Sequence, residues 1–367
     1  MKRPRLLQLL GLSLAVLIAL ALAAEAGLRV FAASRGIDAQ AALDLEHPEG
    51  GLYVPHPYTG YTLRHVPGSP DRNKDGLRGP EVERHKPPGV VRILCLGGST
   101  TYGSGLTADE AYPARLAALL APLSAPGADG GSGRRYEVLN CGVPGYSTAE
   151  SLIDLELRLL EFEPDALVIY HGINDARLVQ ARGFEPDYSH MRVVWREPQV
   201  SPLSQWLWTH SYAYAWLARA GGFGPSTVRL EDLIYVDDWA DLYVPADGGA
   251  AEINRDGVDV FIRNIDSMVA LARARGVEVL LTTFPMRGGA AARVEGQDFA
   301  PTVAVMNRQL VEYARTQGVP LCDFAAALDS RRELFQDQAH LTAEGAAVQA
   351  ELVLQAARAA GQWGLGR

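Results

Sequence analysis

The chain has 367 residues, a length that suits about two domains of ordinary size or one large domain with insertions. Hydrophobic residues make up 48% and charged residues 21%, and the 37 glycines and 22 prolines follow no period, which excludes a collagen, a coiled coil and a disordered chain. The formal net charge of −9 repels phosphate backbones, so no nucleic-acid partner is expected.

Residues 1–35 are predicted to be an N-terminal membrane anchor or signal segment. Lys2, Arg3 and Arg5 precede an uncharged stretch from Leu6 to Ala24 that is long enough to cross a bilayer. Basic residues hold that end in the cytoplasm, so we expect an inner-membrane anchor with the remaining chain in the periplasm or outside the cell. Secretion after cleavage at the small-x-small sequence Ala24-Glu25-Ala26 is the alternative.

The next segment, residues 36–89, is rich in proline, glycine and charge and is predicted to be an extracytoplasmic lead-in or stalk. From residue 90 to 362, short apolar runs alternate with helical patterns, which is typical of a parallel sheet with crossover helices. The expected strands are Val90–Leu96, Tyr136–Leu139, Ala166–Tyr170, Val277–Thr283 and Val319–Phe324. The expected helices are Ala108–Leu120, Thr148–Glu161, Val258–Arg275, Pro301–Gln317 and Thr342 to about Gln362.

An insertion at about residues 176–255 interrupts this alternation. It holds five of the six tryptophans, namely Trp195, Trp206, Trp208, Trp216 and Trp239, and a helix is expected around Tyr212 and Tyr214. The insertion is interpreted either as a lid or substrate platform or as a cap that packs on the body of the domain.

No cofactor and no metal ion is expected. The glycine pattern after the first strand satisfies neither a dinucleotide-binding loop nor a P-loop, and the eight histidines and three cysteines lack zinc-site spacing. Cys95, Cys141 and Cys322 each lie in or beside an apolar run and are expected to be buried and unreactive.

Polar residues follow the predicted strands, where ligands of an open parallel sheet bind. Ser99 follows the first strand, Gly142 the second and Asn174 the third, while Asp337 and His340 precede the last helix. A hydrolytic serine requires a base, a group that orients the base and donors for an oxyanion, and these residues supply all three.

His340 is the expected base, because Asp337 three residues earlier can reach its Nδ1 and fix its tautomer. His171 also stands at a strand end and is the alternative base, and hydrolysis assisted by a metal ion is a weaker alternative. Glycine at position 142 is expected to leave room for the backbone to approach the substrate.

These blocks, in this order and spacing, resemble the SGNH (GDSL-type) hydrolase superfamily, in its membrane-anchored bacterial form, over about residues 90–362. The resemblance implies a three-layer α/β/α, flavodoxin-like fold with a parallel central sheet and an inserted Trp-rich segment. It implies that Ser99, Asp337 and His340 form the catalytic triad and that Ser99, Gly142 and Asn174 form the oxyanion hole.

Two details qualify the resemblance. Gly98 stands where Asp is usual in the family motif, and Thr100 stands where Leu is usual, which bears on the subfamily more than on the chemistry. The sequence from Asn73 to Pro80 is similar to what precedes the nucleophile strand in such proteins, and it suggests no chemical role by itself.

The implied function is that of a serine esterase or lipase-like acylhydrolase that cleaves carboxylic esters through an acyl-enzyme. The expected partners are a small-molecule, glycan or lipid ester as substrate, including O-acetyl groups of extracytoplasmic glycans, and the membrane through the N-terminal segment. An O-acyltransferase that uses the same triad and a catalytically silent binding module are the alternatives.

Overall fold

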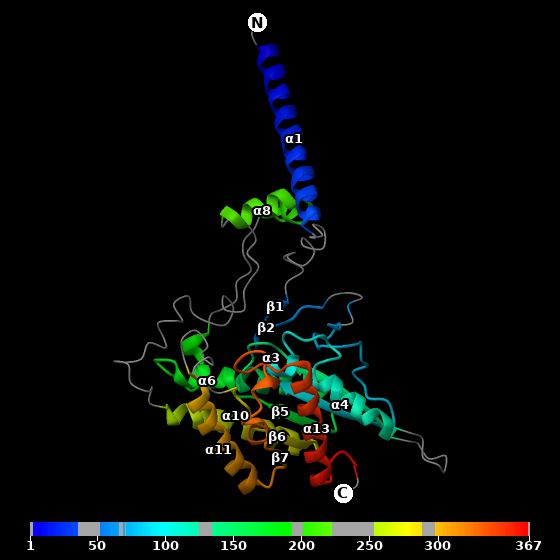
Figure 1. Cartoon of the computed structure of the whole chain (residues 1–367), viewed down its shortest axis with the longest axis vertical. Helices are drawn as coiled ribbons and strands as arrows, with labels where there is room; N and C mark the ends of the chain where they lie inside the picture. Colours follow the sequence, from blue (N-terminus) through cyan, green and yellow to red (C-terminus); the bar gives the residue numbers. More distant parts are fainter. Residues whose placement is uncertain are drawn as a thin grey trace. The chain divides into compact units, whose positions relative to one another are not determined.

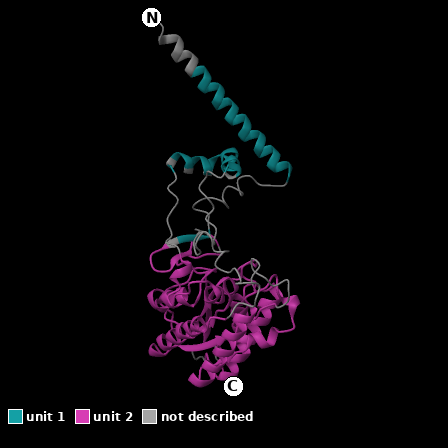
Figure 2. Ribbon diagram, turned by 90° about the vertical axis from the view of Figure 1, so that its left-hand side faces the viewer, with its two compact units in different colours: residues 1–55, 195–229 teal, residues 56–194, 230–367 magenta. Residues whose placement is uncertain are grey.

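The computed structural model of the chain describes residues 3–35, 52–65, 69, 71–124, 134–192, 201–221, 253–287 and 298–365. The chain divides into two compact units (Figure 2). The smaller unit combines Met1–Pro55 with Trp195–Arg229, and the larger one combines His56–Val194 with Leu230–Arg367. The larger unit therefore begins within the segment expected to be a stalk.

A parallel five-stranded sheet forms the centre of the larger unit (Figure 1). Its strands are β3 (Val90–Gly97), β4 (Arg135–Gly142), β5 (Ala166–Tyr170), β6 (Glu278–Thr282) and β7 (Leu321–Cys322), in the order β4-β3-β5-β6-β7. This is the flavodoxin-like order: the chain adds β4 on one side of β3 and then adds β5, β6 and β7 on the other side, so the order of strands reverses between β3 and β5. Ligands of such sheets bind at that reversal, beyond the carboxyl ends of the strands.

Helices form a layer on each side of the sheet, which confirms the predicted three-layer α/β/α fold. One layer contains α4 (Tyr112–Leu120) and α13 (Ala343–Ala360), which contact each other. In the other, α10 (Arg255–Ala274) contacts α5 (Thr148–Leu157), α6 (Ile173–Gln180) and α11 (Ala300–Gln317). The shorter elements of this unit are β2 (Gly60–Leu63), α3 (Ser99–Tyr102), η1 (Ala121–Ser124), η2 (Leu159–Phe162), η3 (Ser189–Met191), α12 (Phe324–Leu328) and η6 (Arg332–Leu334).

Several predicted boundaries shift, among them the ends of the helix predicted over Thr148–Glu161 and of the strand predicted over Tyr136–Leu139. Two of the shifts have a local reason. Helix α4 begins at Tyr112 and not at Ala108, because Pro113 lies in its first turn, where proline is favoured. Strand β7 ends at Cys322 because the Asp323 side chain accepts a hydrogen bond from the N–H of Ala326 and caps α12. The three cysteines are buried as expected, and burial raises the pKa of Cys95 to about 12.

The smaller unit contains α1 (Arg3–Ser34), α7 (Pro202–His210) and α8 (Tyr212–Gly221), and strand β1 (Tyr53–His56) begins in it. Between Gly11 and Ser34, α1 is long and apolar enough to cross a membrane, by length and composition. Residues 201–221 of the Trp-rich insertion group with α1 in this unit, whereas its residues 176–192 and 253–255 belong to the larger unit. Trp195 and Trp239 lie outside the described residues.

Candidate active site

Ser99 begins the one-turn helix α3, directly after β3 ends at Gly97. A Cβ atom at position 97 would lie 2.5 Å from the Tyr170 carbonyl oxygen of the neighbouring strand, so the chain can turn here only with glycine. Helix α3 ends at Gly103, whose φ of 86° is the left-handed conformation that glycine adopts freely. The half-buried Ser99 thus stands at the carboxyl end of β3.

Arg78 holds the other end of α3. Its guanidinium donates to the carbonyls of Tyr102 at 2.5 Å, Gly103 at 2.8 Å and Leu106 at 2.6 Å, and it lies 4.1 Å from the centre of the Tyr102 ring. The Asn73 side chain shapes the preceding turn by accepting from the N–H groups of Asp75 and Leu77. Sequence reasoning gave this segment no role, whereas the structure shows that it supports the turn carrying Ser99.

Asp337 and His340 lie on one closed loop before α13. A bridge between Phe335 and Leu341 closes the loop, and the N–H of Gln336 donates to the His340 carbonyl at 2.8 Å. Asp337 Oδ1 accepts from the N–H groups of Ala339 and His340, both at 2.8 Å. These bonds fix the Asp337 side chain beside the His340 ring before any substrate binds.

The loop brings His340 to Ser99. His340 Nε2 lies 2.7 Å from Ser99 Oγ, and His340 Nδ1 lies 2.7 Å from Asp337 Oδ2. Burial opposes ionisation of Asp337, but hydrogen bonds from the His340 ring and from the two N–H groups outweigh it and lower the pKa of Asp337 to about 2. An ionised Asp337 keeps the proton on Nδ1 and leaves Nε2 free to accept from the serine hydroxyl.

Asn174, in the first turn of α6, lies against the turn that carries Ser99. Its amide Nδ2 donates to the Tyr146 carbonyl at 2.9 Å, which fixes the orientation of the amide. A Cβ atom at position 98 would lie 2.6 Å from this Nδ2, so Gly98 makes room for the amide.

Gly142 differs from the expectation in one respect. Its N–H donates to Asn140 Oδ1 at 3.0 Å, so this candidate oxyanion donor already has an acceptor. The position requires glycine because a Cβ atom would lie 2.7 Å from the Thr101 carbonyl carbon, within the backbone of α3. The packing of β4 against α3 therefore requires glycine at this position.

His171, the alternative base, contacts a different serine. Its Nε2 lies 2.9 Å from Ser151 Oγ, and its Nδ1 lies 3.9 Å from Asp175 Oδ2. All three residues are buried, and burial lowers the pKa of His171 to about 3. His171 is thus a neutral core residue that contacts Ser151. The histidine that contacts Ser99 is His340.

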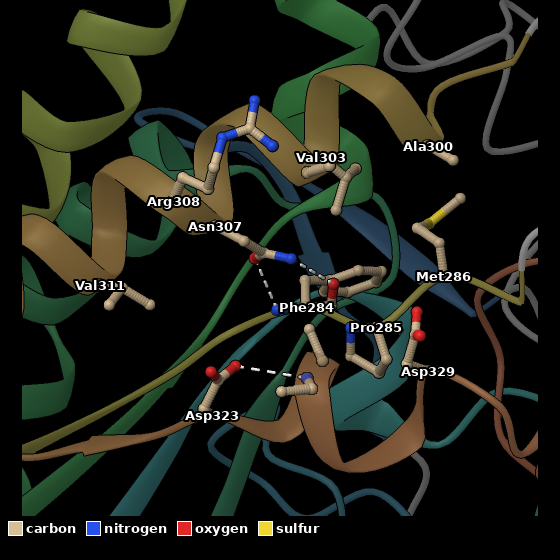
Figure 3. Close-up of a pocket in the computed structure, with 13 residues that line it drawn as sticks. Phe284, Pro285, Met286, Ala300, Val303, Asn307, Arg308, Val311, Asp323 and Asp329 are labelled. Carbon is tan, nitrogen blue, oxygen red and sulfur yellow. Dashed lines mark hydrogen bonds between the residues drawn. The ribbon is translucent and has the colours of Figure 1, made fainter.

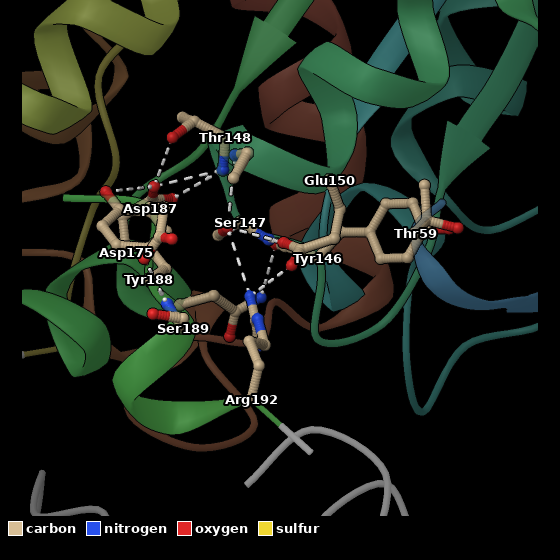
Figure 4. Close-up of polar contacts among 12 residues, drawn as sticks. Thr59, Tyr146, Ser147, Thr148, Glu150, Asp175, Asp187, Tyr188, Ser189 and Arg192 are labelled. Atoms are coloured by element: carbon tan, nitrogen blue, oxygen red, sulfur yellow. Dashed lines mark hydrogen bonds and ion pairs between the residues drawn. The ribbon is translucent and has the colours of Figure 1, made fainter. Parts of the chain in front are cut away.

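Asp175 belongs to a buried polar network that joins α5 to α6 (Figure 4). It accepts from Thr148 through the hydroxyl at 2.5 Å and the N–H at 3.1 Å, and from the Tyr188 hydroxyl at 3.3 Å. Burial raises the pKa of Asp175 to about 7 despite these bonds. The network fixes the first turn of α6, on which Asn174 lies.

A pocket beside α11 does not include the predicted site residues (Figure 3). Asn307 on α11 binds both backbone groups of Phe284, at 2.9 and 2.8 Å, and so fixes the segment that follows β6. At the end of this segment the N–H of Arg287 donates to the Gln338 carbonyl at 2.9 Å, which braces the loop carrying Asp337 and His340. The described residues contain no cluster of His, Cys, Asp and Glu that could hold a metal ion.

The three-layer α/β/α fold carries a hydrogen-bonded series of Ser99, His340 and Asp337 at the carboxyl edge of its parallel sheet. The family model of GDSL-like lipases and acylhydrolases matches residues 95–348, well over half of the chain. The chain therefore belongs to the GDSL-like lipase/acylhydrolase family and is an enzyme that hydrolyses esters. No curated protein matches the sequence.

Solved structures of the family resemble the chain distantly. A GDSL-like lipase from Bacteroides thetaiotaomicron shares 16% identity, with 73% of this chain and 88% of that chain covered and a TM-score of 0.41. An acetylxylan esterase from Geobacillus stearothermophilus shares 15% identity, with 72% and 93% covered and a TM-score of 0.42. The family assignment rests on the sequence match and not on these likenesses.

Proposed function

We propose that the chain is an exported serine esterase that hydrolyses carboxylic esters through an acyl-enzyme on Ser99. The observation that carries this proposal is the hydrogen-bonded series from Ser99 through His340 to Asp337. Such a series makes a serine hydroxyl nucleophilic at neutral pH, because the imidazole takes its proton as the oxygen attacks.

In the proposed reaction, Ser99 Oγ attacks the ester carbonyl while His340 Nε2 takes the hydroxyl proton. The tetrahedral intermediate then expels the alcohol, which receives that proton from His340, and the acyl group stays on Ser99. A water molecule attacks the acyl-enzyme, again giving its proton to His340. Departure of Ser99 as the leaving group releases the carboxylic acid and returns the proton to the serine.

The oxyanion of each intermediate is proposed to bind the N–H of Ser99 and the Nδ2 of Asn174. Gly142 is proposed as a third donor, which requires its N–H to exchange Asn140 Oδ1 for the substrate oxygen. Asn174 suits the role because its amide is neutral, buried and already oriented by the Tyr146 carbonyl.

We also propose that residues 1–35 remain as the anchor of a periplasmic or extracellular hydrolase domain that extends from the lead-in to residue 362. The support is that α1 is long and apolar enough to cross a membrane and that Glu25, within the candidate cleavage sequence Ala24-Glu25-Ala26, is bonded to the start of α8. O-acetylated glycans and lipid esters outside the cytoplasm are the proposed substrates.

The test uses the full chain in detergent with 4-nitrophenyl acetate and butyrate as substrates. Ser99→Ala and His340→Ala should each reduce turnover to background. Ser151→Ala is the matched control, because it alters the other serine–histidine pair and should retain activity. Equal activity of wild type and Ser99→Ala would contradict the proposal, whereas a silent wild type that still reacts with a fluorophosphonate at Ser99 would favour acyl transfer.

A further inference from the structure

Helices α7 and α8 expose four large apolar side chains. Leu203 and Trp206 lie one turn apart on α7 and are 67% and 56% exposed. Trp216 and Leu217 are adjacent on α8 and are 49% and 53% exposed. Exposed large apolar groups gathered on two short helices mark an interaction surface. We refer to these four residues as the apolar set of α7 and α8.

A buried cluster and a hydrogen bond hold the two helices together, and Trp206 of the apolar set stacks on His210 while staying more than half exposed. Trp208 is buried with Ala215 and Ala218, and Tyr212 and Tyr214 pack against this cluster. Ser204 Oγ and the Tyr214 hydroxyl lie 2.6 Å apart and join α7 to α8. The pair is therefore a defined unit with a filled interior and an exposed apolar exterior.

Glu25 of α1 caps the start of α8. Its carboxylate accepts from the N–H groups of Tyr212 at 3.0 Å and Ala213 at 2.9 Å, and from the Ser211 hydroxyl at 2.8 Å. Arg29, one turn further along α1, pairs with Glu25 at 2.5 Å. The cap satisfies N–H groups that the first turn of α8 cannot bond within the helix.

The burial of side chains along α1 changes at Glu25. Every residue from Gly11 to Ala24 is exposed, whereas Glu25, Leu28 and Arg29 are half-buried and Ala32 is 2% exposed. These four residues recur at helical spacing and form one stripe, and α1 contacts α8. The last three turns of α1 are therefore built to bind α8, while the preceding turns have apolar surface for lipid.

The position of Glu25 sets the depth of α7 and α8 in a membrane. The uncharged stretch from Leu6 to Ala24 is about 28 Å long as a helix, close to the thickness of the hydrocarbon core. Glu25, the first charged residue after it, then lies at the outer membrane surface, and α8 is held at that level. Tryptophan and tyrosine favour this interfacial zone, because their rings combine an apolar body with a polar group.

We propose that α7 and α8 form a membrane-interface platform, in which the apolar set inserts at the boundary between the headgroups and acyl chains of the bilayer crossed by α1. This inference rests on the proposed anchor and is independent of ester hydrolysis. The lipid surface is the occupant that the geometry favours, because the cap by Glu25 places the apolar set beside the end of the spanning segment.

The test uses the full chain reconstituted in vesicles of phosphatidylcholine and phosphatidylglycerol. Leu203→Cys and Leu217→Cys carry an environment-sensitive fluorophore, since the three natural cysteines are buried. Nitroxide-labelled lipids with the nitroxide near the headgroup should quench both labels several-fold more than a label at Val311→Cys, an exposed apolar position on α11. A label at Leu14→Cys should respond to nitroxides deep in the bilayer.

Two results would overturn the platform while leaving the anchor intact. One is quenching at positions 203 and 217 no greater than at 311, with Leu14→Cys still quenched. The other is a blue-shifted emission at 203 and 217 without quenching, which would show a protein in place of lipid. An unquenched Leu14→Cys would overturn anchor and platform together, with esterase activity as a separate readout.

Glu25→Ala tests the cap directly. Loss of the carboxylate should reduce quenching at position 217 toward the value at 311, while quenching at position 14 is unchanged. Glu312→Ala, which removes an exposed glutamate of α11, is the matched control and should change neither value. Unchanged quenching at 217 in Glu25→Ala would show that Glu25 does not hold the platform at the membrane.

Discussion

His340 Nε2 lies 2.7 Å from Ser99 Oγ, although 241 positions separate the two residues in the sequence. Ser99 is placed by the end of β3 and by Arg78, while His340 is placed by a closed loop that Arg287 braces through the Gln338 carbonyl. Two independently fixed segments thus meet with the geometry for proton transfer, and each can be perturbed separately.

Asp337→Asn should lower kcat by about 10²- to 10⁴-fold and leave KM nearly unchanged, because an amide no longer stabilises the imidazolium that forms during attack. Steady-state kinetics with 4-nitrophenyl acetate measures the effect. Asp329→Asn, at a carboxylate beside the separate pocket, is the control and should behave as wild type. Full activity of Asp337→Asn would remove Asp337 from the proposed triad.

Asn174→Ala should lower kcat by about 10²- to 10³-fold with little effect on KM, because the amide binds charge that develops in the transition state. Gly98→Ala should give a similar loss although it removes no donor. The added Cβ would lie 2.6 Å from Asn174 Nδ2, and this clash would displace the amide. A change in KM alone for Asn174→Ala would place this residue in substrate binding.

Arg78→Gln should destabilise the larger unit by about 2–4 kcal/mol, because it leaves three carbonyls at the end of α3 without their charged donor. Urea denaturation followed by circular dichroism measures this. Arg315→Gln, at an exposed ion pair, is the control and should leave the free energy of unfolding nearly unchanged. Equal stabilities of the two variants would show that Arg78 does not support the turn carrying Ser99.

Asp175→Asn should change how stability depends on pH. Between about pH 4 and 6.5, native Asp175 holds a proton that the unfolded chain has released, so its contribution to stability falls as pH rises. Native His171 is neutral where the unfolded chain binds a proton, so its contribution rises with pH. The two slopes oppose each other in the wild type.

With the aspartate contribution removed, the free energy of unfolding of Asp175→Asn should fall on acidification more steeply than that of wild type, by about 1.4 kcal/mol per pH unit. Urea denaturation at several pH values in that window measures the slope. His171→Gln should change the slope with the opposite sign. Parallel profiles for Asp175→Asn and wild type would show that Asp175 is ionised in the native state throughout this window.

The sequence by itself determined the fold class, since aliphatic runs such as Ala166–Tyr170 can form only buried parallel strands when helices separate them. It also determined the family, because the residues of the four blocks are local motifs at strand ends. It determined the boundaries less well, since Pro113 moved the start of α4 and the helix predicted over Thr148–Glu161 ends at Leu157.

Tertiary structure alone decided which groups are available to act. Nothing local to Gly142 indicates that α3 packs against it, and nothing local to Ser151 predicts a second serine–histidine pair. The roles of Arg78 and Glu25 depend on their contacts with α3 and α8, which lie many residues later in the chain. Such contacts depend on how distant segments meet in space, which patterns of neighbouring residues do not encode.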